Sequence, residues 1–459
     1  MTKTPETPAR EASLEDFALS THSYGRLTGA SLAIHAIPDA FLLLHTGVGC
    51  KYKGAGQYCL HDLARPSHHR EGYTEVTDLA LIKGSASRIP IYVRGWYKKR
   101  RPSFMGVASS TFLEMAGEDF AKAVEEAGRS VPCPVAYLQT LGFDGDLYDG
   151  YAAVNRKLLE LVPFAKTRSQ PRRVGVVGYA FDRYEMDHAG NLQQLRFLLE
   201  SLGLECGPVL LSGRPTAELM ELASCGRLVA LPYARAYSDG LAALSGRPVV
   251  ATGLPVGISG TFRWLKDVAE ACGVKASVLE GCVRAQSEYA RPQLDMFRSY
   301  ARQRIGAGRT AVFADTPLAA GLCSLLIELG MPPVLAGLRD RSLGGRKAFT
   351  EALSRAGTPA PDDLEVLECP SLERVRSRVH ELRDRRGLSL VLGSHTELSA
   401  LGRGPTDRSG SGEPRPGSAE IPSVEIGFPS LGYHVLFPTP FYGVAGALAT
   451  AQRIMNLIR

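Results

Sequence analysis

The sequence lacks the signatures of several common classes of protein. No segment matches the phosphate-binding pattern GxxxxGK[ST], so we expect that the chain does not itself hydrolyse ATP. The glycine turn at Val177-Gly178-Tyr179 is not a GxGxxG fingerprint, which predicts that neither NAD nor FAD is bound in the usual way. The net charge is +6, but no basic helix with interleaved aromatic residues accompanies it. We therefore expect no nucleic-acid partner.

Long apolar runs are also absent. The stretch from Ile34 to Leu44 is interrupted by His35, Pro38 and Asp39, so it cannot form a bilayer-spanning helix. Residues 1–16 are mostly polar and contain no apolar core of a secretory signal. These absences predict a cytoplasmic protein with no membrane partner. Its nine cysteines are then expected to be thiols or metal ligands rather than disulfides.

What the sequence does contain is the balance of an ordinary globular protein. Hydrophobic residues make up 44% and charged residues 22% of the 459 residues. A chain of this length is too long for a single ordinary core and predicts two to four domains.

Short β-rich runs alternate with helical patterns through the last two thirds of the chain. The predicted strands are 174–179, 209–211, 228–231, 248–251, 311–314, 333–335 and 388–393, and the predicted helices are 191–202, 216–224 and 317–329. This alternation predicts parallel βαβ units in open, doubly wound sheets, and therefore an α/β fold class with three Rossmann-like domains.

The alternation restarts near residues 168 and 308, after helical or charged stretches. We therefore predict an N-terminal domain over 1–167, a middle Rossmann-like domain over 168–307 and a C-terminal Rossmann-like domain over 308–459. Residues 402–420 are rich in Gly, Pro, Ser and charge, which predicts a disordered surface insertion without chemistry.

A glycine-rich turn follows the apolar run 41–44 and reads His45-Thr46-Gly47-Val48-Gly49-Cys50. A strand that ends in such a turn presents its cysteine on a loop, where backbone amides can approach an inorganic sulfide. A single loop cysteine is not specific, so the neighbouring motifs decide its interpretation.

This turn is one of four motifs that follow one another along the chain. They are LTGA at 27–30, the turn ending in Cys50, TFLEMAGED at 111–119, and EIGFPS at 425–430, which is followed by PFYGVAGA at 440–447. In order and spacing they resemble the nitrogenase component 1 family, which includes both nitrogenase subunits, their cofactor-assembly scaffold and the dark-operative tetrapyrrole reductases. The resemblance covers residues 24–459 and implies stacked Rossmann-like domains.

Carried over residue by residue, the resemblance implies that Cys50 is a ligand of a bridging iron–sulfur cluster. Two further family cysteines match Gly25 and Phe112 here, so neither position supplies a thiolate. A [4Fe–4S] cluster needs about four protein ligands. In the tetrapyrrole reductases of this family one subunit gives three cysteines and its partner gives one. This chain resembles the one-ligand partner, and the implied cluster is shared with a second component 1-like subunit.

Other candidate residues have weaker support. Cys59 is either an extra metal ligand or a buried cysteine under the loop. His61, His68 and His69 are interpreted as an exposed loop, with metal or acidic-substrate binding as the alternative. His188 and His434 are candidate polar groups near a substrate cavity. In addition, Pro232 lies near the position of the family's cofactor cysteine, which argues against an iron–molybdenum-type cofactor.

The resemblance implies an oxidoreductase subunit. It would accept electrons from a separate ATP-hydrolysing iron–sulfur protein and help to reduce a small molecule or a tetrapyrrole. Two alternatives stay open. One is a scaffold for metallocofactor assembly, and the other is a clusterless, non-catalytic paralogue that acts as a binding or regulatory subunit.

Overall fold

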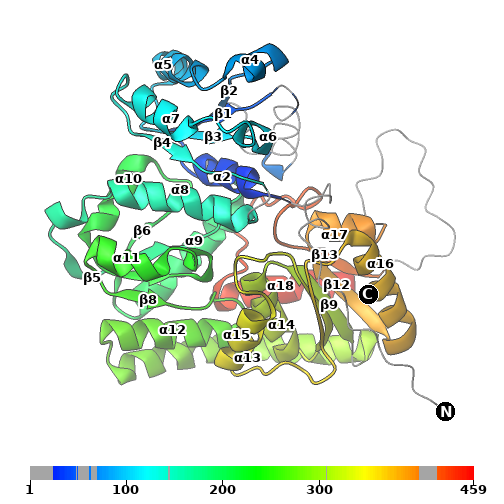
Figure 1. Ribbon diagram of the computed structural model, residues 1–459. Coiled ribbons are helices and arrows are strands. Elements are labelled where there is room, and N and C mark those ends of the chain that lie inside the picture. The colour runs from blue at the N-terminus through cyan, green and yellow to red at the C-terminus, as the bar shows by residue number, and fades with distance from the viewer. Residues whose placement is uncertain are drawn as a thin grey trace.

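The computed structural model describes residues 24–47, 49, 61–63, 70–142, 145–306, 308–402 and 421–458. Every strand pairing within this part of the chain is parallel, and the strands form three separate sheets with helices on their faces. Figure 1 shows the first sheet at the top, the second at the lower left and the third at the lower right. The predicted α/β fold class with parallel sheets is confirmed.

The first sheet has the strand order β2-β1-β3-β4. Its central strands are buried along their whole length, as expected for parallel strands covered on both faces. The elements of this region are α2 (Arg26–His35), β1 (Ala40–His45), β2 (Glu71–Tyr73), α4 (Asp78–Lys83), α5 (Arg88–Arg100), β3 (Phe104–Ser109), α6 (Thr111–Glu114), α7 (Phe120–Gly128), β4 (Val135–Leu138), α8 (Leu147–Leu161) and η2 (Phe164–Lys166).

The second sheet has the order β6-β5-β7-β8. The predicted strand at 209–211 is displaced, because β6 ends at Val209. Leu210 and Leu211 are fully buried beyond the strand end, and Leu211 has a positive φ of 56°. The elements are β5 (Gln170–Val177), α9 (Met186–Ser201), β6 (Glu205–Val209), α10 (Thr216–Met220), η3 (Glu221–Ser224), β7 (Cys225–Ala230), η4 (Pro232–Ala234), α11 (Ser238–Ser245), β8 (Val249–Ala251), α12 (Ile258–Cys272) and α13 (Ala276–Ile305).

The third sheet has five strands in the order β11-β10-β9-β12-β13. Its elements are β9 (Arg309–Ala314), α14 (Thr316–Glu328), β10 (Pro333–Leu338), α15 (Gly345–Ala356), β11 (Glu365–Glu368), α16 (Leu372–Arg386), β12 (Leu388–Gly393), α17 (His395–Ala400), β13 (Ser423–Glu425) and α18 (Gly443–Leu457). The predicted insertion at 402–420 lies, apart from Gly402, outside the described residues.

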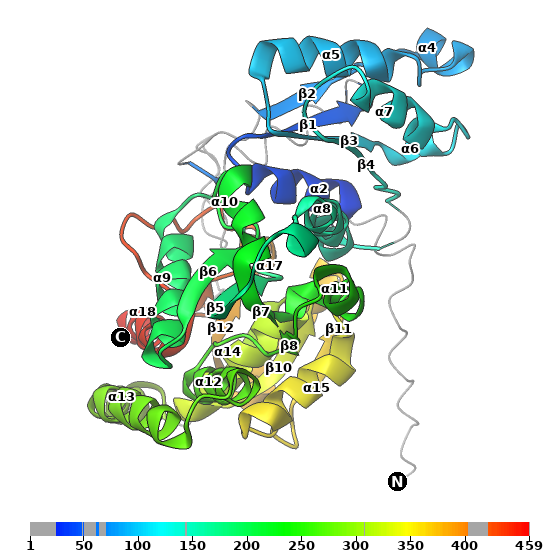
Figure 2. The same cartoon turned by 90° about the vertical axis from the view of Figure 1, so that its left-hand side faces the viewer.

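The second and third sheets are joined by long helices. In Figures 1 and 2, α12 and α13 lie on the side of the molecule opposite the first sheet. The C-terminal helix α18 packs against α9, α12 and α13, and so returns to the middle of the molecule. The division at residues 168 and 308 stays a proposal. It agrees with the starts of β5 and β9, whereas α18 crosses it.

Two glycines allow α2 and α8 to cross at very close range. A Cβ atom at Gly29 would lie 1.7 Å from the carbonyl oxygen of Leu147, and one at Gly150 would lie 1.9 Å from that of Arg26. The glycine of the LTGA motif is therefore required by helix packing, whatever its role in function. This contact fixes α2 at the base of the first sheet.

We expect that Gly29→Ala destabilises the protein by about 3 kcal/mol, at the upper end of overpacking effects, because the new methyl group clashes with backbone and the helices must separate. The matched control is Gly95→Ala in the exposed face of α5, where no atom lies within 4 Å of the new Cβ. That variant should gain about 0.5–1 kcal/mol from helix propensity. Melting temperatures of both variants check the prediction, and equal shifts would contradict it.

Among the described residues, none of the helices combines the length and the apolar composition that crossing a membrane requires.

Candidate functional site

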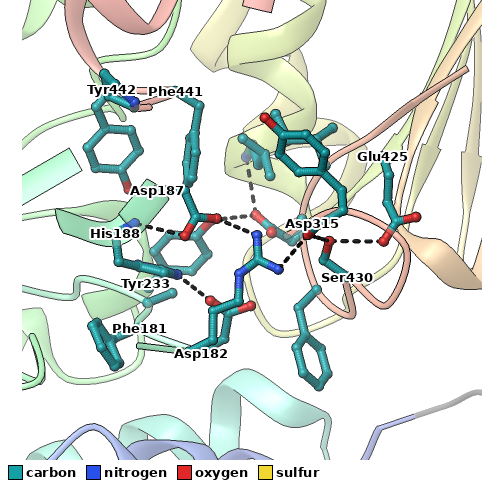
Figure 3. A pocket seen from close by; sticks show the side chains of 18 of the residues that line it. Phe181, Asp182, Asp187, His188, Tyr233, Asp315, Glu425, Ser430, Phe441 and Tyr442 are labelled. Carbon is teal, nitrogen blue, oxygen red and sulfur yellow. Dashed lines mark hydrogen bonds and ion pairs between the residues drawn. The ribbon is translucent and has the colours of Figure 1, made fainter. Parts of the chain in front are cut away.

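A small central cavity lies where strand ends of the second and third sheets meet α2 and α8. Its volume is about 80 Å³, and Figure 3 shows side chains that line it. In parallel sheets ligands bind outside the carboxyl ends of the strands, and this cavity occupies such a position. Most lining residues come from two segments, 180–188 after β5 and 425–442 from the end of β13 onward. Further side chains come from α8, η4 and the end of β9, and among them are Tyr148, Tyr233 and Asp315.

Asp182 is the centre of a buried hydrogen-bond network. One carboxylate oxygen pairs with Nε2 of His188, and the other lies 2.9 Å from Nε2 of His61. His188 Nδ1 lies 2.7 Å from the hydroxyl of Tyr179, and His61 Nδ1 accepts the backbone N–H of Ser430 at 3.0 Å. The network therefore ties His61 to the segment after β5 and to the segment after β13.

Charge pairing governs the ionisation of this network. Burial alone would raise the pKa of Asp182, but the charges of His188 and His61 outweigh it and hold that pKa well below its usual range. Burial likewise opposes protonation of His188, and the Asp182 carboxylate overcomes it and raises the pKa of the imidazole. Both imidazoles therefore pair through Nε2 with the single carboxylate of Asp182, which fixes the two rings relative to each other.

Arg183 forms a second buried ion-pair cluster beside the first. Its guanidinium pairs with Asp187 and lies 3.6 Å from Glu185, and it donates to the carbonyl of Tyr433 at 3.0 Å. Glu185 in turn accepts the backbone N–H of Val435 at 2.8 Å. These contacts tie the segment 426–442, which lines the cavity, to the segment after β5.

Asp315 closes the cavity on the side of the third sheet. Its carboxylate accepts hydrogen bonds from the hydroxyls of Tyr233 at 2.8 Å and Tyr148 at 2.9 Å, and it caps α14 through the N–H of Leu318. Burial raises the pKa of Asp315, and burial together with the charge of Asp315 raises the pKa of the neighbouring Asp340 to about 7.

The sequence-predicted histidines are separated by the structure. His188 lines the central cavity. His434 is not among the lining residues, and its imidazole pairs with Glu185 at 2.6 Å with 30% of the side chain exposed. Both stay predictions as substrate-binding groups.

His61 corrects the interpretation of the histidine-rich segment as an exposed loop. It is only 1% exposed, because its imidazole is packed edge-on against Phe428 and paired with Asp182. His68 and His69 lie outside the described residues. Sequence reasoning missed Asp182, Arg183 and Asp187, although the charged run FDRYEMDH directly after a buried strand was a usable signal.

The positions that match the family's cluster ligands lie close together at the carboxyl ends of β1 and β3. Gly25 is next to Gly142, whose N–H donates to the hydroxyl of Thr111 at 2.9 Å. The adjacent Phe112 packs against Gly47, at the start of the turn that leads to Cys50. Gly25 and Phe112 offer no ligand atom, and Cys50 and Cys59 lie outside the described residues.

The described cysteines are not placed to bind a metal. Burial raises the pKa of Cys206 to about 11 and, despite the nearby charge of Arg173, that of Cys225 to about 12, so both stay thiols. No group of three or more His, Cys, Asp or Glu side chains in the described part of the chain is arranged to hold a metal ion.

These features define a three-sheet α/β protein with its cavity at the carboxyl ends of parallel strands. The family model of the nitrogenase component 1 type oxidoreductases matches residues 26–459, and the chain belongs to this family.

The similar proteins include several kinds of family member. The nitrogenase molybdenum-iron protein beta chain of Frankia alni is 23% identical over 94% of this chain and 80% of its own length. The nitrogenase iron-molybdenum cofactor biosynthesis protein NifN of Rhodobacter capsulatus is 30% identical, over 35% of this chain and 36% of its own length. The solved structure of nitrogenase Cp1 at pH 6.5 superimposes with a TM-score of 0.70 and 17% identity, over all of this chain and 94% of that one. At 17% identity, the similarity to this solved structure shows a shared fold only.

Proposed function

We propose that this chain is the one-ligand subunit of a nitrogenase-like two-component reductase. Cys50 supplies one thiolate to a [4Fe–4S] cluster, and a second component 1-like subunit supplies the others. The electron donor is a separate ATP-hydrolysing iron–sulfur protein, and the pair reduces a small molecule or a tetrapyrrole. When bound, the cluster carries single electrons at low potential.

The observation that carries this proposal is that Gly25, Phe112 and Gly47 lie near one another at the carboxyl ends of β1 and β3. Two of the three positions matched to the family's ligands, Gly25 and Phe112, lack a donor atom, and we propose that another chain supplies the missing ligands. Phe112 is 44% and Met115 72% exposed, which leaves an apolar surface beside the turn. A partner subunit that covered this surface would exclude water from the cluster.

The central cavity has a volume of about 80 Å³ and a lining of ion pairs and aromatic rings, which gives it room for a few waters.

The test is anaerobic co-purification with the three-cysteine component 1-like subunit from the same genome, followed by iron analysis and EPR. We expect about four iron atoms per heterodimer and a cluster signal on reduction, with no iron in this chain alone. A full cluster in the isolated chain would overturn the shared-ligand proposal, and an iron-free complex would favour the clusterless alternative.

A cofactor-assembly scaffold is the second candidate, and the similarity to NifN favours it. The two are distinguished by turnover. A reductase consumes electrons from the reduced donor protein continuously, whereas a scaffold transfers its metal cargo once and then stops.

A further inference from the structure

A second and much larger cavity lies between the second and third sheets. Its volume is about 500 Å³, against about 80 Å³ for the central cavity. The hydrogen bond between Tyr233 and Asp315 separates the two, because both of these residues line the central cavity while their neighbours Pro232 and Thr316 line the large one. We name the larger cavity the intersheet cleft.

The intersheet cleft lies where carboxyl strand ends face each other across the gap. Residues directly after β7 and β8 form one wall, and the start of α14 and part of α15 form the other. Carboxyl ends of parallel strands are the usual place for ligands in α/β proteins, and a volume of several hundred Å³ suits a small organic molecule. Part of the wall is apolar and comes from Leu231, Leu254, Val256, Trp264, Pro317 and Ala320.

Two arginines in the wall share a single buried counter-charge. Asp267, with 8% of its side chain exposed, binds Nη2 of Arg263 at 2.8 Å and Nη2 of Arg355 at 3.0 Å. One carboxylate therefore fixes two guanidinium groups, and the three side chains carry a net charge of +1. Both arginines line the cleft.

Four residues that line the cleft carry a buried polar atom without a partner. These atoms are Nε of Arg263, Nε1 of Trp264 and the Oγ1 atoms of Thr252 and Thr316, and none has a hydrogen-bond partner among the described residues. Buried polar atoms are normally satisfied, so each exception requires an explanation. Two of these four groups can only donate, which favours a ligand that presents acceptor oxygens.

The acidic side chains at the cleft do not favour a cation. Asp239 and Glu351 are exposed and solvated, and Asp267 is already occupied by two arginines. The nearby helix N-termini are capped internally, since Glu328 binds the first N–H groups of α12 and Asp315 caps α14. The side chains of the wall, rather than helix ends, would therefore recognise the ligand.

We propose that the intersheet cleft binds a small organic acid whose carboxylate pairs with Arg263 and Arg355 and whose apolar body packs against the apolar part of the wall. A planar guanidinium fork matches a carboxylate, and Asp267 holds both forks in place beforehand. This inference does not depend on the proposed electron-transfer function, because it uses none of the cluster-ligand positions.

The chain contains two tryptophans, Trp96 and Trp264, so one substitution gives a specific optical probe. In a Trp96→Phe background the fluorescence of Trp264 reports on the cleft alone. We expect a saturable change on titration with benzoate, and at least tenfold weaker binding of the uncharged isostere benzamide.

Two variants test the location of this binding. Arg355→Gln should weaken benzoate binding at least tenfold, and Ala352→Phe, which fills the cleft from α15, should abolish it. The matched control Arg374→Gln, on α16 and outside the lining of the cleft, should bind as the parent does. The proposal is overturned if benzoate causes no saturable change, if benzamide binds equally well, or if both cleft variants bind benzoate like the control.

Discussion

Cys50→Ser is expected to remove half or more of the iron from the complex with the partner subunit. A serine oxygen is a harder and weaker ligand for cluster iron than a thiolate, and no other described side chain near Gly47 replaces it. Iron per heterodimer and the EPR signal of the reduced complex measure the effect. Electron consumption from the donor protein should fall in parallel.

The matched control is Cys133→Ser in the same region of the chain. Cys133 is buried, and burial raises the pKa of its thiol, so it is a packing residue. Serine there should cost about 1–3 kcal/mol through the burial of a hydroxyl and should leave iron content unchanged. If Cys50→Ser also kept its iron and its activity, Cys50 would not be the cluster ligand that the family resemblance implies. The clusterless, non-catalytic paralogue would then be the favoured alternative.

Much of the fold follows from local sequence patterns. The strand–helix alternation predicted parallel sheets. Each buried parallel strand is a short apolar run, and each helix that connects two strands shows apolar residues at helical spacing. Helix α9 was predicted from Asn191, where the leucine spacing starts, but it begins at Met186 because its first turn carries the polar and charged residues of the site. Patterns of apolar residues therefore miss helix turns that serve a site.

The candidate site was less predictable because long-range contacts create it. His61 and Asp182 are more than a hundred residues apart in the chain, and neither has a sequence signature that names its partner. The same applies to Arg183 and the carbonyl of Tyr433, which are brought together by the return of the chain after β13. A charged residue just after a buried strand indicates a site, but only the packing of three sheets determines which charges meet.

The intersheet cleft illustrates the same limit. Arg263 and Asp267 are four residues apart on α12 and form a predictable helical pair. Arg355 binds Asp267 from α15, the helix between β10 and β11 of the third sheet. The contact between Arg355 and Asp267 is what places a second arginine beside the first in the wall of the cleft. Sequence reasoning therefore predicted the fold class, but not this cleft.

The second large effect is expected at Arg183. Arg183→Met leaves the carboxylates of Asp187 and Glu185 without their shared cation in a buried environment, since the guanidinium is only 5% exposed. Removing one partner of a buried ion pair costs about 3–5 kcal/mol. The melting temperature should fall by roughly 10 °C, and the segment 426–442 should become sensitive to proteolysis because Arg183 no longer holds Tyr433.

Two companion variants make this result specific. Arg129→Met removes an ion pair with Glu125 in which both side chains are about 70% exposed, so its cost should be about 1 kcal/mol or less. The double variant Arg183→Met, Asp187→Leu removes a buried charge of each sign and should recover part of the stability, because an apolar pair can replace a buried ion pair at little cost. If Arg183→Met lowers the melting temperature no more than Arg129→Met does, the ion pairs of Arg183 do not hold the segment 426–442. Its position must then depend on the hydrogen bonds that the N–H groups of Phe441 and Tyr442 donate to Oδ1 of Asn191.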